Sequence, residues 1–228
     1  RGVVVGRVVV FDMDDTLFSE REFVRSGFYA VDRFLLDEYG SSDFFSKAWA
    51  LFDSGERGKI FNQALIDIAE IESTEFLIKK MLSVYRAHLP SIRLFDDAKW
   101  ALEYYSTKVP LALVSDGYLQ TQKNKANALG IDAFFQKMYF TDQWGEECWK
   151  PSTCAFLKVE ENFNALKDEC IYISDNPKKD FIAPNRLGWD SIHIKRSAGE
   201  YANETIPKDG HPQKIIHSLY DLKDILSI

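Results

Sequence analysis

A nearly continuous run of apolar and β-branched residues lies close to the start of the chain, at residues 3–11, interrupted only by Gly6 and Arg7. A run of this kind, without polar alternation, predicts a strand that is buried on both faces. Such strands are typical of parallel sheets, because helices cover both sides of those sheets. The run therefore favours an α/β architecture and argues against an all-helical fold.

Further strands and helices alternate in the C-terminal part of the chain. Short apolar segments closed by polar residues predict strands at 109–114, 170–174 and 191–194. Apolar spacing predicts helices at 96–106 and at 119–129, the second ending before a C-capping Gly130, and a final amphipathic helix at 215–228. We expect a doubly wound, mostly parallel, Rossmann-like sheet with right-handed crossovers.

Residues 18–91 interrupt this alternation. Helical periodicity occurs at 23–39, 46–52, 59–71 and 74–88, and no segment between them has a strand pattern. Roughly seventy helical residues are too many for one crossover between neighbouring strands. We interpret residues 18–91 as an inserted α-helical cap domain, with residues 1–17 and 92–228 forming the core.

Polar residues follow three of the predicted strands, namely Asp12 and Asp14 after the first, Ser115 after the second and Asp175 after a later one. A single Asp at a strand end is usually a turn or capping residue. Three acidic turns at corresponding ends are harder to obtain by chance, and in open α/β sheets these ends meet in one cleft. Carboxylates packed together repel one another unless a hard cation neutralises them, and Mg²⁺ prefers oxygen ligands.

This group of residues is suited to phosphoryl transfer. A carboxylate such as Asp12 can attack phosphorus and form an aspartyl phosphate, which divides one difficult displacement into two easier ones. Asp14, two residues further on, can share the cleft, protonate the leaving oxygen and later activate water. Ser115 and the amides that follow it can hold phosphoryl oxygens. Lys150, in a loop before a predicted helix, can offset the charge of the nucleophile and the phosphate.

In these four segments the sequence resembles the haloacid dehalogenase superfamily, and specifically its phosphatases with a helical cap after the first strand. VVVFDMDDTL resembles the nucleophile motif, LVSDG the Ser/Thr motif, WKP the lysine motif and ISDNPKKDF the acidic motif with two Asp five residues apart. The resemblance covers residues 1–17 and about 93–200, whereas the cap matches only in position and helical character. Ser174 departs from the family pattern, because many members have Gly there.

The resemblance implies a role for each matching residue. Asp12 would be the nucleophile, Asp14 the general acid/base and Lys150 the bridge between nucleophile and substrate. Phosphate binding falls to Ser115, Asp116 and Lys150, although Asp116, like Asp15, is expected to serve the turn rather than catalysis. Mg²⁺ would be bound by Asp12, Asp175 and the backbone carbonyl of Asp14, with Thr16 and Asp180 supporting the site.

Three alternatives remain at this point. Dehalogenases of the superfamily need neither the second Asp nor a metal, so Asp14 and the acidic motif favour phosphoryl chemistry. A phosphomutase would use the same aspartyl phosphate and pass the phosphoryl group to a sugar. A non-catalytic binding domain would be expected to have lost Asp12, Asp14, Lys150 or Asp175. For the substrate, Arg57 is the cap residue that we expect to reach the cleft.

Composition narrows the partners and the location. The 228 residues carry a net charge of -7, which argues against general binding to nucleic acid or to anionic membranes, and no apolar run is long enough to span a membrane. Cys148, Cys154 and Cys170 lack zinc-type spacing, and we expect all three to be reduced thiols. The chain begins at Arg1, so we expect a trimmed N-terminus, and without a signal-peptide pattern a cytoplasmic monomer or homodimer that acts on a small phosphorylated metabolite.

Overall fold

The computed structural model describes residues 7–40, 42–66, 68, 71–197 and 205–226. The chain divides into two compact units, one formed by Arg1–Glu20 and Arg93–Ile228 and the other by Arg21–Ile92. We call them the sheet unit and the helical unit. The helical unit is an insertion after the first strand, so two segments separated by about seventy residues of chain build the sheet unit together.

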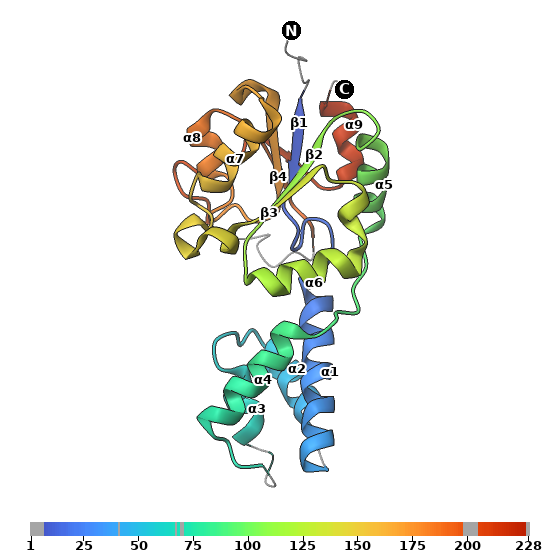
Figure 1. The fold of residues 1–228 in the computed structure, drawn as a ribbon, viewed down its shortest axis with the longest axis vertical. Coiled ribbons are helices and arrows are strands. Elements are labelled where there is room, and N and C mark those ends of the chain that lie inside the picture. The colour runs from blue at the N-terminus through green and yellow to red at the C-terminus, as the bar shows by residue number, and fades with distance from the viewer. Residues whose placement is uncertain (1–6, 41, 67, 69–70, 198–204, 227–228) are drawn as a thin grey trace. The chain divides into compact units, whose positions relative to one another are not determined.

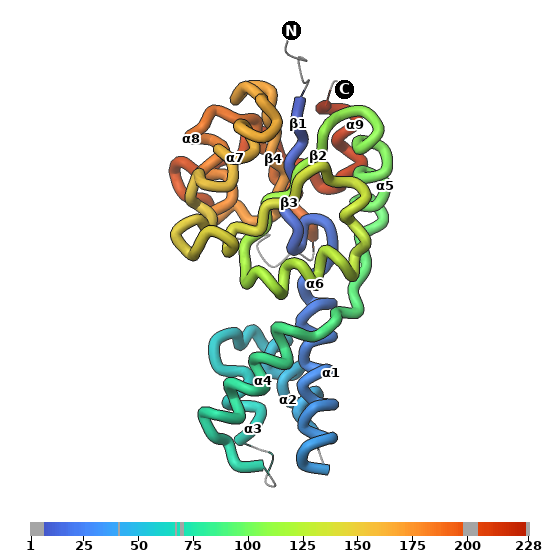
Figure 2. Tube along the Cα trace, viewed as in Figure 1, coloured from blue at the N-terminus to red at the C-terminus, as the bar shows by residue number. Residues whose placement is uncertain are grey.

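The sheet unit contains a six-stranded sheet in the order β3-β2-β1-β4-β5-β6, and every neighbouring pair is parallel. β1 lies in the middle, between β2 and β4 (Figure 2). The chain adds β2 and β3 on one side of β1 and then returns to add β4, β5 and β6 on the other side. The strands are β1 Val8–Phe11, β2 Leu111–Ser115, β3 Lys137–Phe140, β4 Cys170–Ser174, β5 Asp190–Ile194 and β6 Lys214–Ile216.

The central strands are buried on both faces, as their uninterrupted apolar sequences predict. Every residue of β1, β2 and β4 is buried. Helices cover the sheet on two sides: α7 and α8 lie on one side, and α5 and α9 on the other (Figure 1). The helices are α5 Asp96–Tyr105, α6 Leu119–Leu129, α7 Cys154–Phe163, α8 Ile182–Leu187 and α9 Leu222–Ile225. This is the expected doubly wound, Rossmann-like α/β fold.

The face of the sheet towards α7 contains one aromatic cluster. Phe156 of α7 is fully buried, and its ring contacts the rings of Tyr172 on β4 and Trp189 in edge-to-face geometry, with centroids 5.0 and 5.3 Å apart. Edge-to-face pairs at these separations add to the stabilisation from buried apolar area. Because Tyr172 belongs to β4, this packing also fixes the strand that carries part of the site.

The described residues of the helical unit form four helices: α1 Glu20–Tyr39, α2 Phe44–Asp53, α3 Ile60–Ile66 and α4 Glu75–Ala87. Phe28 of α1 is buried at its centre, with the rings of Phe44, Phe52, Phe61 and Tyr85 at centroid distances of 5.8 to 6.2 Å. These side chains come from all four helices, so one aromatic core holds the unit together.

Several expectations need correction. Residues 214–216 form β6 instead of the start of a helix, because they pair with β5, and α9 is limited to Leu222–Ile225. The predicted helix at 59–71 is shorter, since α3 ends at Ile66, and part of the remainder lies outside the described residues.

The expectation for Gly130 is confirmed, because this residue caps α6 in the left-handed conformation, with φ of 64°. None of the described helices has both the length and the apolar composition needed to cross a membrane.

The aromatic cluster gives a test of the packing. Replacing Phe156 with Ala removes a fully buried ring and leaves a cavity against β4, so the free energy of unfolding should fall by about 3–5 kcal/mol. The neighbouring Leu157 is 46% exposed, and Leu157→Ala should change it by less than about 0.5 kcal/mol. Urea unfolding of both variants measures the difference, and equal losses would contradict this account of the core.

Candidate active site

The carboxyl ends of the central strands gather the polar motif residues. Asp12 directly follows β1, Ser115 is the last residue of β2 and Asp175 directly follows β4. The backbone N–H of Asp12 donates to the carbonyl of Ile173 over 2.9 Å, which continues the β1–β4 pairing into the loop. The strand order reverses at β1 and β4, and a reversal of this kind opens a crevice where ligands bind in α/β sheets.

Lys150 lies at the centre of the group. Its Nζ is 2.8 Å from Oδ1 of Asp12 and 3.0 Å from Oδ2 of Asp180, and it also donates to the hydroxyl of Tyr172 over 3.0 Å. Burial alone would lower the pKa of Lys150, but the charges of Asp12 and Asp180 outweigh burial and hold the pKa well above its usual value. Lys150 is therefore a buried lysine whose charged form is favoured and which three groups hold in place.

The site contains more negative charge than Lys150 neutralises. Burial, together with the charges of Asp180 and Asp14, raises the pKa of Asp12 to about 7 although Lys150 opposes the shift. Burial raises the pKa of Asp175 well above its usual range, and the charge of Asp12 adds to this effect. A divalent cation among these carboxylates would favour their charged forms and reverse both shifts.

The carboxylates have the composition and the unsatisfied atoms of a cation site. Oxygens of Asp12, Asp175 and Asp180 lie within 4.8 Å of one another, and all three residues are buried. Among the described residues, Oδ2 of Asp175 and Oδ1 of Asp180 are buried side-chain atoms without a hydrogen-bond partner. Such atoms are costly to bury unless a ligand satisfies them. An all-oxygen donor set of this kind fits Mg²⁺.

Two hydroxyls support the acidic residues. Thr16 Oγ1 is 3.5 Å from Oδ2 of Asp12 and 3.5 Å from Oδ1 of Asp175, so it lies between the two carboxylates. Ser174 donates a short hydrogen bond to Oδ2 of Asp180, and Ser174 is completely buried. The serine that departs from the family pattern therefore contacts the second Asp of its own motif, and it leaves Oδ1 of Asp180 without a protein partner.

Asp14 and Ser115 are linked through α6. Asp14 is hydrogen-bonded through Oδ2 to Nε2 of Gln122 over 2.7 Å and paired through Oδ1 with Nζ of Lys125 over 2.5 Å. The same Nε2 of Gln122 is 2.8 Å from Oγ of Ser115. Gln122 therefore connects the end of β2 with the loop after β1.

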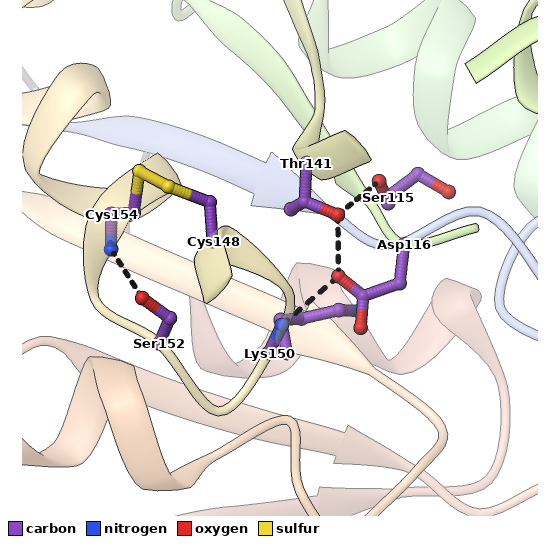
Figure 3. Close-up of a disulfide and its surroundings, with 7 residues drawn as sticks. All are labelled: Ser115, Asp116, Thr141, Cys148, Lys150, Ser152 and Cys154. Atoms are coloured by element: carbon purple, nitrogen blue, oxygen red, sulfur yellow. Dashed lines mark hydrogen bonds between the residues drawn. A yellow bond between two sulfur atoms is a disulfide. The ribbon is translucent and has the colours of Figure 1, made fainter. Parts of the chain in front are cut away.

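Asp116 anchors the loop that carries Lys150. Its Oδ1 accepts hydrogen bonds from Oγ1 of Thr141 over 2.8 Å and from the backbone N–H of Lys150 over 3.1 Å (Figure 3). Its Oδ2 pairs with Nζ of Lys179 at 2.6 Å. Burial alone would raise the pKa of Asp116, but the charges of Lys150 and Lys179 outweigh it and keep the pKa below its usual value. Asp116 therefore holds the loop of Lys150 in place, and its contact with phosphate stays a prediction.

The same loop contains a disulfide, which corrects the expectation of three reduced thiols. Cys148 and Cys154 are bonded, with their Cα atoms 5.3 Å apart (Figure 3). In the sequence they flank Lys150. Cys170 is a free, buried thiol on β4. The sequence offered no way to choose a pair among three cysteines. In the structure, Cys148 ends a short 3-10 helix and Cys154 begins α7, and the turn between these two elements brings the two cysteines together.

Six of the predicted site residues line a pocket of about 200 Å³, namely Asp12, Asp14, Asp116, Lys150, Asp175 and Asp180. Ser115 and Thr16 are fully buried and do not belong to its lining. Arg57 belongs to the helical unit, where its guanidinium lies 4.2 Å from the ring centroid of Phe52, and its assignment to the substrate stays a prediction. Six carboxylates and two lysines contribute to the lining: Asp12, Asp14, Glu20, Asp116, Asp175, Asp180, Lys150 and Lys179.

Sequence reasoning missed Gln122, Lys125, Tyr172 and Lys179. Tyr172 looked like an ordinary apolar strand residue, and Lys179 like a solvated charge within the acidic motif. The other two lie in the predicted helix at 119–129, and only the structure shows that the buried face of this helix is mostly polar, with Thr121, Gln122, Lys125 and Ala126. A helix that buries polar side chains next to a catalytic motif indicates that they have partners there.

Comparison with known proteins agrees with the four motifs. The sequence model of the haloacid dehalogenase-like hydrolases matches residues 9–194. The chain belongs to this family. The matched region begins inside β1 and ends with β5, so it includes all the polar strand ends described above.

Relatives cover nearly the whole length of the chain. One from Methanocaldococcus jannaschii, named glyceraldehyde 3-phosphate phosphatase, is 23% identical over 225 residues, with 96% of each chain covered. The structure of the HAD-hydrolase YfnB from Bacillus subtilis, described as bound to magnesium, aligns with a TM-score of 0.68 at 18% identity and covers 98% of this chain and 100% of its own. A 2-haloacid dehalogenase from Pseudomonas syringae aligns with a TM-score of 0.66 at 20% identity, with 98% and 99% covered. At these identities the structural similarity establishes the fold alone.

The disulfide should stabilise the loop that carries Lys150. Closing a loop between cysteines six residues apart removes unfolded-state entropy worth about 2 kcal/mol. A Cys148→Ser/Cys154→Ser variant should therefore unfold at a temperature about 4–8 °C lower than the wild type under non-reducing conditions. A reductant should lower the melting temperature of the wild type and leave the variant unchanged, which is the control. Equal melting of both proteins without reductant would contradict the prediction.

Proposed function

We propose that this protein is a Mg²⁺-dependent phosphatase that hydrolyses a small phosphorylated metabolite through an aspartyl phosphate on Asp12. The observation that carries the proposal is the position of Lys150, whose Nζ lies between the carboxylates of Asp12 and Asp180 while Asp175 stands beside them. This arrangement places a fixed cation at one oxygen of the attacking carboxylate and keeps the neighbouring acidic oxygens available for a metal.

In the first step, an oxygen of Asp12 attacks phosphorus. A bond forms between that oxygen and phosphorus, the bond from phosphorus to the ester oxygen breaks, and Asp14 gives the leaving oxygen its proton. Lys150 stabilises the charge that develops on the phosphoryl group, and Ser115 donates a hydrogen bond to a phosphoryl oxygen. Burial of Asp12 favours this step because a poorly hydrated carboxylate has fewer water contacts to lose.

In the second step, water attacks the phosphorus of the aspartyl phosphate. Asp14, now a carboxylate, takes a proton from the water as the bond between phosphorus and Asp12 breaks, and inorganic phosphate leaves. Asp14 thereby returns to its protonated form and Asp12 to a carboxylate. Asp12 is thus the nucleophile in the first step and part of the leaving group in the second, whereas Asp14 acts first as the acid and then as the base.

The residues that would hold Mg²⁺ are Asp12, Asp175 and the backbone carbonyl of Asp14, with Asp180 adjacent. Bound there, the cation would draw the phosphoryl oxygens towards Asp12 and offset the negative charge of the reaction centre. The orphaned oxygens of Asp175 and Asp180 support this assignment, because each would gain a partner in the metal or in its coordinated water.

The relatives and the residues of the site both favour a phosphatase over the alternatives. The curated relative from M. jannaschii is named for a small phosphorylated substrate, which supports that substrate class for this chain. A dehalogenase has no need of the partners that Asp14 makes with Gln122 and Lys125. A phosphomutase stays open as the second candidate, since it would use the same Asp12 and Asp14.

Replacing the nucleophile tests the proposal. Asp12→Asn should reduce phosphatase turnover by about 10⁴-fold or more, because an amide does not displace the leaving group. Asp15→Asn is the matched control from the same motif: Asp15 accepts a hydrogen bond from the backbone N–H of Glu20 over 2.9 Å, and Asn can accept it too. Release of inorganic phosphate with Mg²⁺ measures both variants. Full activity of Asp12→Asn would contradict the assignment.

A panel of phosphorylated metabolites assayed with Mg²⁺ separates the two candidate functions. Stoichiometric release of inorganic phosphate is expected of the phosphatase, and an isomerised sugar phosphate without free phosphate would identify a mutase.

A further inference from the structure

Two of the polar side chains on the buried face of α6, Gln122 and Lys125, reach Asp14, and the mechanism above does not use them. Gln122 is 1% exposed and Lys125 is 3% exposed, and they lie three residues apart on the same side of the helix. Burying a lysine or an amide is costly unless its donors are satisfied. Replacing a buried ion pair with apolar residues is often neutral or stabilising, so fold stability alone gives little reason to place a lysine here.

Both side chains reach the same carboxylate. Lys125 Nζ contacts Oδ1 of Asp14 at 2.5 Å, and Gln122 Nε2 contacts Oδ2 at 2.7 Å, so each oxygen of Asp14 has its own donor. Each carboxylate oxygen has a second lone pair, and the two donors therefore leave room for a transferred proton. Two contacts from one rigid helix restrict the carboxylate far more than one contact would, because they fix both its position and its plane.

We call Gln122 and Lys125 the clamp on Asp14. The clamp also reaches Ser115, the residue proposed to bind phosphate. Gln122 Nε2 is also 2.8 Å from Oγ of Ser115, so a single amide joins the acid/base group to the hydroxyl at the end of β2. Gly117 favours this arrangement, since its φ of +121° suits glycine and a Cβ added there would lie only 3.2 Å from Cδ of Gln122. Lys125 Nζ additionally lies 3.5 Å from Oε1 of Glu20, so the lysine stands between two carboxylates.

We propose that Gln122 and Lys125 are positioning residues that hold Asp14 in the orientation required for proton transfer to the leaving oxygen and from water. The proposal rests on the proposed function, because it assigns a role in the same reaction. Gln122 sets the separation between Asp14 and Ser115, and Lys125 sets the plane of the carboxylate. Both act through Asp14, and neither has a role of its own at the phosphoryl group in the mechanism above.

The leaving group of the substrate distinguishes this role from a structural one. An alkyl phosphate has a poor leaving group that must be protonated as it departs, whereas p-nitrophenyl phosphate has a good one that needs little help. Loss of the clamp should therefore slow the first turnover of an alkyl phosphate, such as glycerol phosphate, and spare that of p-nitrophenyl phosphate. A general distortion of the pocket would slow both.

The variants are chosen to remain folded. Gln122→Met keeps the approximate volume and changes no charge, and Lys125→Met combined with Glu20→Gln removes one cation together with one anion. Gln120→Met and Lys123→Met are the matched controls, because Gln120 and Lys123 lie on the exposed face of the same helix. Lys125→Arg keeps a cation that can still pair with Asp14. Thermal melting of every variant reports whether the fold is retained.

We expect Gln122→Met and the charge-neutral double variant to lower the first-turnover rate of the alkyl phosphate by about 10–100-fold, part of the factor that general acid catalysis supplies. The corresponding rate for p-nitrophenyl phosphate should stay within about threefold of the wild type, and turnover after the first should slow as water activation fails. Both control variants should behave as the wild type, and Lys125→Arg should recover part of the alkyl phosphate rate.

Two outcomes would overturn the proposal: equal slowing of both substrates, or unchanged rates for both, in Gln122→Met that melts as the wild type does. Failure of the proposed function is recognised separately, because the wild type would then release no phosphate from either substrate or Asp12→Asn would retain activity.

Discussion

The contact of Lys150 with Asp12 and Asp180 is the interaction on which the organisation of the site depends. It brings one buried cation to two buried carboxylates, at 2.8 and 3.0 Å, and these three residues come from segments that lie far apart in the sequence. Removing the cation would leave the carboxylates uncompensated in a poorly hydrated pocket, a change that is strongly destabilising for buried pairs. The loop that presents Lys150 is held in turn by the disulfide and by Asp116, so much of the surrounding structure serves to place one ammonium group.

The sheet explains why these charges converge. β1 and β4 are neighbours although most of the sheet unit lies between them in the chain, and the residues that follow them are Asp12 and Asp175. Each strand is buried on both faces, so its register is set by the packing, and the loops inherit that precision at their first residue. The consequence is a pocket whose acidic residues stand on rigid elements, as preorganised electrostatic catalysis requires.

Much of the fold could be predicted from the sequence because its central elements are strongly patterned. The apolar runs at 109–114 and 170–174 correspond to β2 and β4, and α6 ends at Gly130 as expected. β3 and β6 were missed because they lie at the edges of the sheet, where partial exposure leaves no continuous apolar signal. At 215–228 the apolar spacing was compatible with a helix. Only the pairing with β5 shows that residues 214–216, where this helix was expected to begin, form a strand.

The site was predictable where a motif concentrates its residues, and unpredictable where partners come from elsewhere. Asp12, Asp175 and Lys150 could be named from local sequence, and the structure brings them together. Gln122 and Lys125 could not, because polar residues in a helix ordinarily indicate a solvated face and their contacts depend on how α6 packs. The disulfide depends on a turn whose geometry the cysteine spacing does not specify.

The central claim is that Asp12 becomes phosphorylated during turnover, and rapid acid quenching tests it most directly. The enzyme is mixed with Mg²⁺ and a phosphate monoester, quenched within the first turnovers and then digested. The peptide that contains Asp12 should carry the additional mass of one phosphoryl group. Borohydride reduction of the acyl phosphate then locates the modified residue, and Asp12→Asn should give no such peptide. Phosphate release without any phosphorylated peptide, or phosphorylation at another residue, would contradict the account.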